Sequence, residues 1–220
     1  MRNTPDLIDS LVADASPVRR LRRPMVRAAC WLLAAALLLA LVAVVHGVRP
    51  DLILKLQQPV FVASVAAAIV TGAMAVVAAF IVSVPGRSRR WQLLPLPALA
   101  VWMTTIGYGC LTNWVEMGPE GISPGETARC FATLVIVSTP LWAALLTMLR
   151  YVAHLSPAPV AMCASLAVAA MTATGLSLFH PLDASAMILL WNLGVALLFV
   201  GAGGLFGRQM FGWVARYRSA

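Results

Sequence analysis

The chain has 220 residues, of which 61% are hydrophobic and only 11% are charged. A water-soluble domain of this length could not bury so much apolar surface in one core, so the composition excludes a soluble enzyme. The net charge of +8 would suggest nucleic acid in a soluble protein. Basic residues that flank apolar stretches are explained instead by membrane topology and by anionic lipid headgroups, and we expect no direct contact with nucleic acid.

The first 27 residues form a polar segment that contains TPDLIDSLVADASPVRRLRRP. Thr4 followed by Pro5 predicts the start of a short amphipathic helix. The apolar stripe of this helix consists of Leu7, Ile8, Leu11 and Val12, and the acidic residues on its other faces include Asp6 and Asp9. A helix this short is marginal alone in water and becomes ordered when it docks. These residues therefore predict a partner-binding segment, and the alternative is a disordered start with no partner.

Six apolar stretches follow, each near the ~20 residues that a helix needs to cross a bilayer. They cover residues 28–46, 60–84, 93–111, 130–149, 159–178 and 186–206. Prolines and short polar loops separate them. The sequence thus predicts an all-α, polytopic integral membrane protein. Its six-helix transmembrane domain over 28–206 lies between a cytoplasmic segment at 1–27 and a basic, aromatic tail at 207–220.

The distribution of basic residues predicts the orientation. If the N-terminus is inside, only Arg49, Lys55 and Arg129 of the 16 basic residues lie outside. This asymmetry follows the positive-inside rule, so both termini are expected in the cytoplasm. The C-terminal sequence GRQMFGWVARYRSA is then expected to anchor the chain on the membrane surface.

The cysteines fall into two pairs in this topology. Cys110 closes the third span and Cys130 opens the fourth, so both are expected at the outer surface. Because the two spans are consecutive, we expect their outer ends to be neighbours. A bridge that closes this loop would be worth about 3 kcal/mol. A constitutive disulfide, a thiol switch and a soft-metal site all remain open for this pair. His46 and His180 could complete a four-ligand zinc or cadmium site, although no close ligand spacing supports one.

Chemistry inside the membrane has little support. Cys30 and Cys163, near the inner ends of their spans, are expected to be small apolar core residues. No charged residue falls clearly inside a predicted span, which argues against an ion-coupled transporter. The sequence also lacks a phosphate-binding loop, an H-E-x-x-H pair and a Ser/His/Asp constellation. We therefore expect neither an enzyme nor a bound cofactor.

Several segments resemble one family along nearly the whole chain. They are DLIDSLVADASPVRRLRRP, LILKLQQPVF, SVPGRSRR, Gly109-Cys110, Cys130, and FHPLDAS followed by WNLG. The chain resembles the NrsF-type family of six-span bacterial anti-sigma factors. The resemblance implies that the cytoplasmic N-terminal segment holds an extracytoplasmic-function sigma factor at the bacterial inner membrane. It also implies that outer cysteines sense oxidative or heavy-metal stress, a role that falls here on Cys110 and Cys130.

The resulting hypothesis is a signal that crosses the membrane. Oxidation or metal capture at the outer cysteines would shift the third and fourth spans, change how the tail presents its apolar stripe, and release the sigma factor. The competing interpretations are a small-molecule or metal transporter or channel, and a scaffold subunit of a membrane complex. Gly203 and Gly207, four residues apart, also leave a homodimer open.

Overall fold

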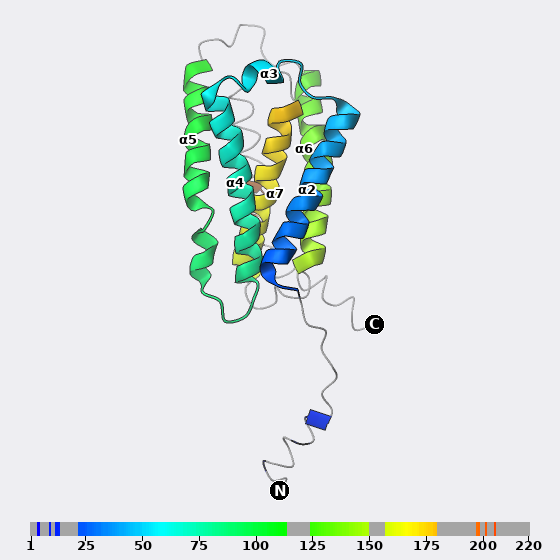
Figure 1. Cartoon of the computed structure of the whole chain (residues 1–220), viewed down its shortest axis with the longest axis vertical. Coiled ribbons are helices and arrows are strands. Elements are labelled where there is room, and N and C mark those ends of the chain that lie inside the picture. The colour runs from blue at the N-terminus through cyan, green and yellow to red at the C-terminus, as the bar shows by residue number, and fades with distance from the viewer. Residues whose placement is uncertain are drawn as a thin grey trace.

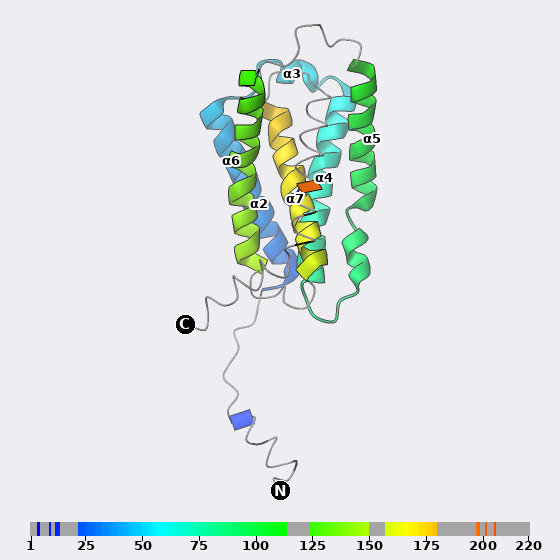
Figure 2. The same cartoon turned by 180° about the vertical axis from the view of Figure 1, so that it is seen from behind.

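The computed structural model describes residues 22–113, 124–149 and 157–179, together with eight isolated positions. These are Thr4, Asp9, Val12, Ala13, Leu197, Leu198, Gly201 and Leu205. The elements in chain order are α2 (Pro24–His46), α3 (Leu52–Lys55), α4 (Pro59–Val82), the 3-10 helix η1 (Arg89–Leu93), α5 (Leu96–Asn113), α6 (Pro124–Leu149) and α7 (Pro157–Phe179). The long helices stand side by side as an upright bundle (Figures 1 and 2). Within the described ranges the fold is all-helical, as predicted.

Prolines set where the helices begin. Pro24 and Pro59 occupy the first turns of α2 and α4, and Pro124 and Pro157 are the first residues of α6 and α7. Proline suits this position because its fixed φ is helical and its missing N–H has no partner there in any helix. Gly47, with φ +77°, ends α2 in a conformation that favours glycine.

The described helices agree with five of the predicted spans, with shifted ends. Three helical stretches are long and apolar enough to cross a membrane, namely Pro24–Val45, Pro59–Val82 and Pro159–Phe179, and a shorter apolar one covers Leu134–Leu149. The sixth predicted span, 186–206, lies outside the described residues except for four helical positions. The count of six spans therefore stays a prediction. The first span begins earlier than expected because α2 starts at Pro24 rather than at residue 28.

Helices α4 and α7 form the centre of the bundle, and their contact is the most extensive between any two described elements. Small side chains line it. The buried alanines of α4 and α7 are Ala67, Ala68, Ala75, Ala78, Ala79, Ala161, Ala164, Ala167, Ala169, Ala170 and Ala173. A Cβ added to Gly72 of α4 would lie 2.6 Å from Cε of Met171 and 3.4 Å from Cβ of Ala170. Small residues allow two helix backbones to approach closely, which is how helices associate in lipid.

The other long helices cover this central pair from two sides. α5 packs on α4, with Trp102 and Ile106 against small residues of α4 and α7. On the other side α2 and α6 pack together and against α4 and α7. There the fully buried indole N–H of Trp31 donates a 3.2 Å hydrogen bond to the carbonyl oxygen of Leu141 in α6. A buried indole usually finds such an acceptor.

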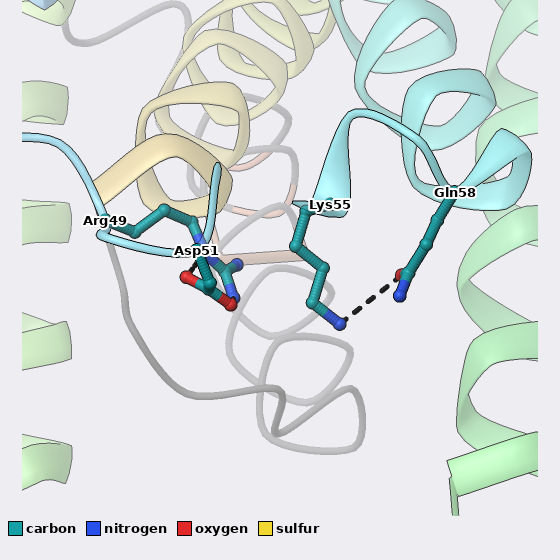
Figure 3. Close-up of polar contacts among 4 residues, drawn as sticks. All are labelled: Arg49, Asp51, Lys55 and Gln58. Carbon is teal, nitrogen blue, oxygen red and sulfur yellow. Dashed lines mark hydrogen bonds and ion pairs between the residues drawn. The ribbon is translucent and has the colours of Figure 1, made fainter. Parts of the chain in front are cut away.

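A buried arginine fixes the loop between α2 and α4. Arg49 is 4% exposed, and its Nε and Nη2 donate to the two carboxylate oxygens of Asp51 at 2.7 and 2.6 Å. Its backbone N–H donates to the carbonyl oxygen of Leu178 in α7, and its guanidinium lies 5.9 Å from the ring centroid of Phe61. Figure 3 shows this pair beside α3, where Lys55 Nζ donates to Gln58. The hydrogen bonds from Arg49 hold the pKa of Asp51 below its usual range.

The close approach of α4 and α7 predicts an asymmetric response to added volume. Gly72→Val should lower the free energy of unfolding by about 1–3 kcal/mol, because its side chain meets Met171 and Ala170. Gly107→Val in α5 is the matched control, since a Cβ there meets nothing within 4 Å. Unfolding of both purified variants in detergent, followed by tryptophan fluorescence, measures the difference. Equal losses would contradict the assigned contact.

The Arg49–Asp51 pair predicts a pH-dependent contribution to stability. Because the pKa of Asp51 is lowered in the folded state, its carboxylate stabilises the fold above its ordinary pKa of about 3.9, and this contribution is lost as the pH falls through the lowered pKa. Asp51→Asn should therefore have a lower unfolding midpoint than the wild type at pH 7. The difference should shrink as the pH approaches 3. A difference that stayed constant over this range would contradict the ion pair as its source.

Candidate functional site

Most of the described basic residues lie at one end of the bundle. The start of α2, the loop after α4 and η1 lie at one end, and the loop with α3 lies at the other (Figure 1). The described basic residues of the first end, which we call the basic end, are Arg22, Arg23, Arg27, Arg87, Arg89 and Arg90. The sequence places no acidic residue in 15–50 or in 52–115. The basic end therefore carries a positive charge that attracts negatively charged groups.

Arg27 shows that the basic end reaches into the bundle. Arg27 is 8% exposed, and its guanidinium lies 4.6 Å from the ring centroid of Phe80 in α4. This is a cation–π contact between the first turn of α2 and the last turns of α4. The sequence places Arg27 at the end of the polar segment before the first predicted span, and its hydropathy does not predict a buried contact with Phe80. The available signal was Pro24, which starts the helix one turn before Arg27.

Arg49 is the second buried cation that the sequence analysis treated only as a marker of orientation. It lies at the opposite end of the bundle and is held by Asp51, as described above. The signal in the sequence was an aspartate two residues after the arginine, in a loop that opens with a glycine. An arginine so close to a carboxylate can form the bidentate pair that the structure contains.

The predicted partner-binding segment is described only at isolated positions. Asp9 and Val12 are helical and exposed, and the exposed fraction of Val12 is 69%. The other residues of the predicted site, Asp6, Leu7, Ile8 and Leu11, lie outside the described residues. The stripe therefore stays a prediction. The chain enters the bundle at Arg22 and Arg23, so this segment joins the basic end directly.

The predicted outer-surface ligands belong to helices that are spread over the bundle. His46 is the last residue of α2, Cys110 lies in the last turns of α5, and Cys130 lies early in α6. Their side chains and the whole of His180 are outside the described residues. Among the residues whose side chains are described, no three His, Cys, Asp or Glu residues form a group that could hold a metal ion.

The structure corrects one argument about the cysteine pair. α5 packs on α4, whereas α6 packs on α7 and α2. Figures 1 and 2 show α5 and α6 on opposite flanks of the bundle. The expectation that the outer ends of the third and fourth spans are neighbours therefore has no support from helix packing, because α4 and α7 lie between α5 and α6. A direct Cys110–Cys130 bridge loses the geometric reason given for it, and the sensing role of the two cysteines stays a prediction.

The inner cysteines differ from each other. Cys163 is 5% exposed in α7, and its Sγ lies 3.9 Å from the carbonyl oxygen of Gln92 in η1, so its expected place in the core is confirmed. Cys30 is exposed on α2, and the same expectation is wrong for it. The reason is the narrow buried face of α2, on which Ala28, Trp31 and Ala35 point inward.

Comparisons with known proteins show the family of this chain. A family model described as NrsF, negative regulator of sigma F, matches residues 11–213. A curated relative from Azospira oryzae, named probable anti-sigma-F factor NrsF, is 29% identical over 215 residues, which cover 96% of this chain and 99% of the relative. No solved structure matches the chain. Because the family model covers most of the chain, this protein belongs to the NrsF family of negative regulators of sigma F.

Proposed function

We propose that this protein is an anti-sigma factor of the bacterial inner membrane that holds an extracytoplasmic-function sigma factor through its N-terminal segment. The observation that carries the proposal is the family match over residues 11–213, which covers both the bundle and much of this segment. Negative regulation of a sigma factor requires a protein-binding surface. In this chain the N-terminal segment is the longest polar segment outside the predicted spans, and it precedes three helical stretches that are long enough to cross a membrane.

The chemistry of the segment suits a protein groove better than a membrane surface. Its apolar stripe would enter a hydrophobic groove of the sigma factor, as amphipathic helices commonly do. Asp6 and Asp9 would be repelled by anionic headgroups and attracted by basic residues of a partner. Exposed Val12 and exposed Asp9 leave both kinds of contact available. The basic end would then face the cytoplasm, in agreement with the positive-inside rule.

The proposed signal enters at the other side of the membrane through Cys110 and Cys130. Because α5 and α6 flank α4 and α7 on opposite sides, the two thiols would act on two separate helices of the bundle. A bridge between them would require their Cα atoms to come within about 7 Å, whereas oxidation or metal capture at each thiol requires no such approach. Tenfold release of the sigma factor needs about 1.4 kcal/mol of coupling between this event and the tail.

If the apolar stripe holds the sigma factor, adding negative charge to the stripe should release the sigma factor constitutively. Leu7→Asp/Leu11→Asp should raise expression from a sigma-dependent reporter by about tenfold or more, because a groove that accepts leucines excludes carboxylates. The same variant should no longer retain the sigma factor in a pull-down from detergent-solubilised membranes. Ser10→Asp/Ala13→Asp is the matched control, since it adds the same charge on the opposite face of the predicted helix.

The outcomes of this experiment separate the possible contact surfaces. Full repression by the double aspartate variant would refute the tail as the contact. Equal release by the control pair would show that added charge matters and the stripe does not. Capture of no sigma factor by any of the chains, the wild type included, would refute the proposed function itself.

The cysteine assignment predicts loss of induction with sequestration intact. Cys110→Ser/Cys130→Ser should keep the reporter repressed and should abolish its response to an oxidant or to cadmium. Cys30→Ser is the control, because this exposed thiol lies on α2 and outside the proposed sensor. If the two thiols act on separate helices, each single variant should lose only part of the response. Unchanged induction in the double variant would contradict the sensor.

A further inference from the structure

An apolar groove opens at the basic end between α2, α4 and η1. Its volume is about 390 Å³, and its wall is almost wholly apolar. The lining residues are Arg23, Pro24, Met25, Ile81, Arg87 and Trp91. Met25 and Trp91 are large side chains that are 59% and 42% exposed. The groove therefore has an apolar wall, and two of its lining residues are arginines.

A second, smaller hollow adjoins this groove and shares Arg87 with it. It measures about 120 Å³ and is lined by the turn from Val82 to Arg87 and by Arg89. The turn is fixed locally, because Gly86 adopts φ +80° and the Oγ of Ser88 accepts a hydrogen bond from the N–H of Arg90 at the start of η1. Polar and apolar atoms line this hollow in similar measure. Arg87 belongs to both linings, so an apolar space and a more polar space lie against the same arginine.

The position of this site determines which ligand it meets. Pro24 and Val82 are the terminal residues of two helical stretches that are long enough to cross a membrane, so the groove lies where acyl chains meet headgroups. Trp91 is a residue type enriched at this level. The sequence has no acidic residue in 15–50 or in 52–115, the two stretches that supply all the lining residues. A ligand here needs an apolar chain and a negative head.

We propose that the groove and the adjoining hollow bind one anionic phospholipid of the adjacent leaflet. An acyl chain would lie along Met25, Ile81 and Trp91, and the phosphate would lie between the guanidinium groups of Arg23, Arg87 and Arg89. Arginine suits this role because its planar fork donates two parallel hydrogen bonds to phosphate. Basic pockets between helices at the cytoplasmic side are a recurrent way to bind anionic lipids. Only the identity of the leaflet rests on the proposed orientation.

The bound lipid would connect two parts of the chain that are far apart in sequence. Arg23 precedes α2 and continues the N-terminal segment, whereas Arg87 belongs to the loop after α4. One phosphate that contacts both would tie the root of this segment to the end of α4. An anionic lipid would bind the site more tightly than a zwitterionic lipid, because the headgroup of a zwitterionic lipid carries its own cation.

Native mass spectrometry of the full-length protein in detergent tests the inference. The probes are phosphatidylglycerol and phosphatidylcholine with the same acyl chains. We expect one phosphatidylglycerol per chain, bound about tenfold more tightly than phosphatidylcholine, and about tenfold weaker binding for Arg23→Gln/Arg87→Gln. Arg22→Gln/Arg90→Gln is the control, because these exposed arginines line neither space, and it should change binding by less than about threefold.

A second pair of variants tests the acyl part of the site. Trp91→Ala should weaken phosphatidylglycerol binding, whereas Leu93→Ala, on the same 3-10 helix but outside the groove, should not. Glycerol 3-phosphate at the same concentration should not displace the lipid. If both pairs of arginine substitutions weakened lipid binding equally, the lipid would be held by the overall positive charge of the basic end, and the proposed site would be wrong. Displacement by glycerol 3-phosphate would reduce it to an anion site and overturn the lipid assignment.

The remaining outcomes concern other occupants and the proposed function. If the wild type bound no phosphatidylglycerol and only Leu7→Asp/Leu11→Asp did, the groove of the wild type would be a docking place for the N-terminal segment, and the lipid proposal would fail. Sigma-factor capture is measured on the same preparations. Absence of sigma-factor capture by the wild type, with lipid binding retained, refutes the proposed function alone. Absence of specific lipid binding with capture retained refutes only the present inference.

Discussion

The close approach of α4 and α7 is the contact on which the rest of the bundle depends. Lipid offers no hydrophobic gain when two apolar helices meet, so their association relies on packing, and packing improves when small residues let the backbones come together. Gly72 against Met171 and the surrounding alanines meet this requirement. Once this pair is formed, α5 covers one side of it, and α2 and α6 cover the other. The order of the flanking helices, and with it the separation of α5 from α6, follows from that choice of centre.

Helix α2 is attached to this centre at both of its ends by a buried arginine. At the basic end Arg27 stacks on Phe80 of α4, and beyond the other end Arg49 pairs with Asp51 and donates its backbone N–H to Leu178 of α7. Between them Trp31 is hydrogen-bonded to α6. α2 is also the helix that continues directly from the N-terminal segment. A change at the loop that contains α3 therefore has a direct physical route to that segment along a single helix, provided that α2 has two stable packings.

Hydropathy predicted the existence of the helices well and their neighbours poorly. A run of apolar residues determines that a segment is helical in lipid, because every backbone polar group must be satisfied within it. Such a run carries no information about which helices lie beside each other. Order in the sequence alone predicts that α5 and α6 are neighbours, whereas the packing separates them. Arg27 was placed outside the first span because its charge outweighed the helix-starting signal of Pro24. The alanines of α4 and α7 were visible in the sequence, yet alanine is also a common residue on faces that contact lipid.

The first turn of α2 brings together the features that bear on function. Arg23 borders the apolar groove, and Arg27, one turn later, lies over Phe80 next to Ile81 of that groove. The backbone N–H of Arg27 donates a 3.2 Å hydrogen bond to the carbonyl oxygen of Arg23, so a ligand that draws on Arg23 acts on the helix turn that Arg27 fixes to α4. The N-terminal segment leaves the bundle at this point. A rotation of α2 that disturbed the Arg27–Phe80 contact would displace Arg23 at the same time, so the apolar groove and the root of the N-terminal segment would change together.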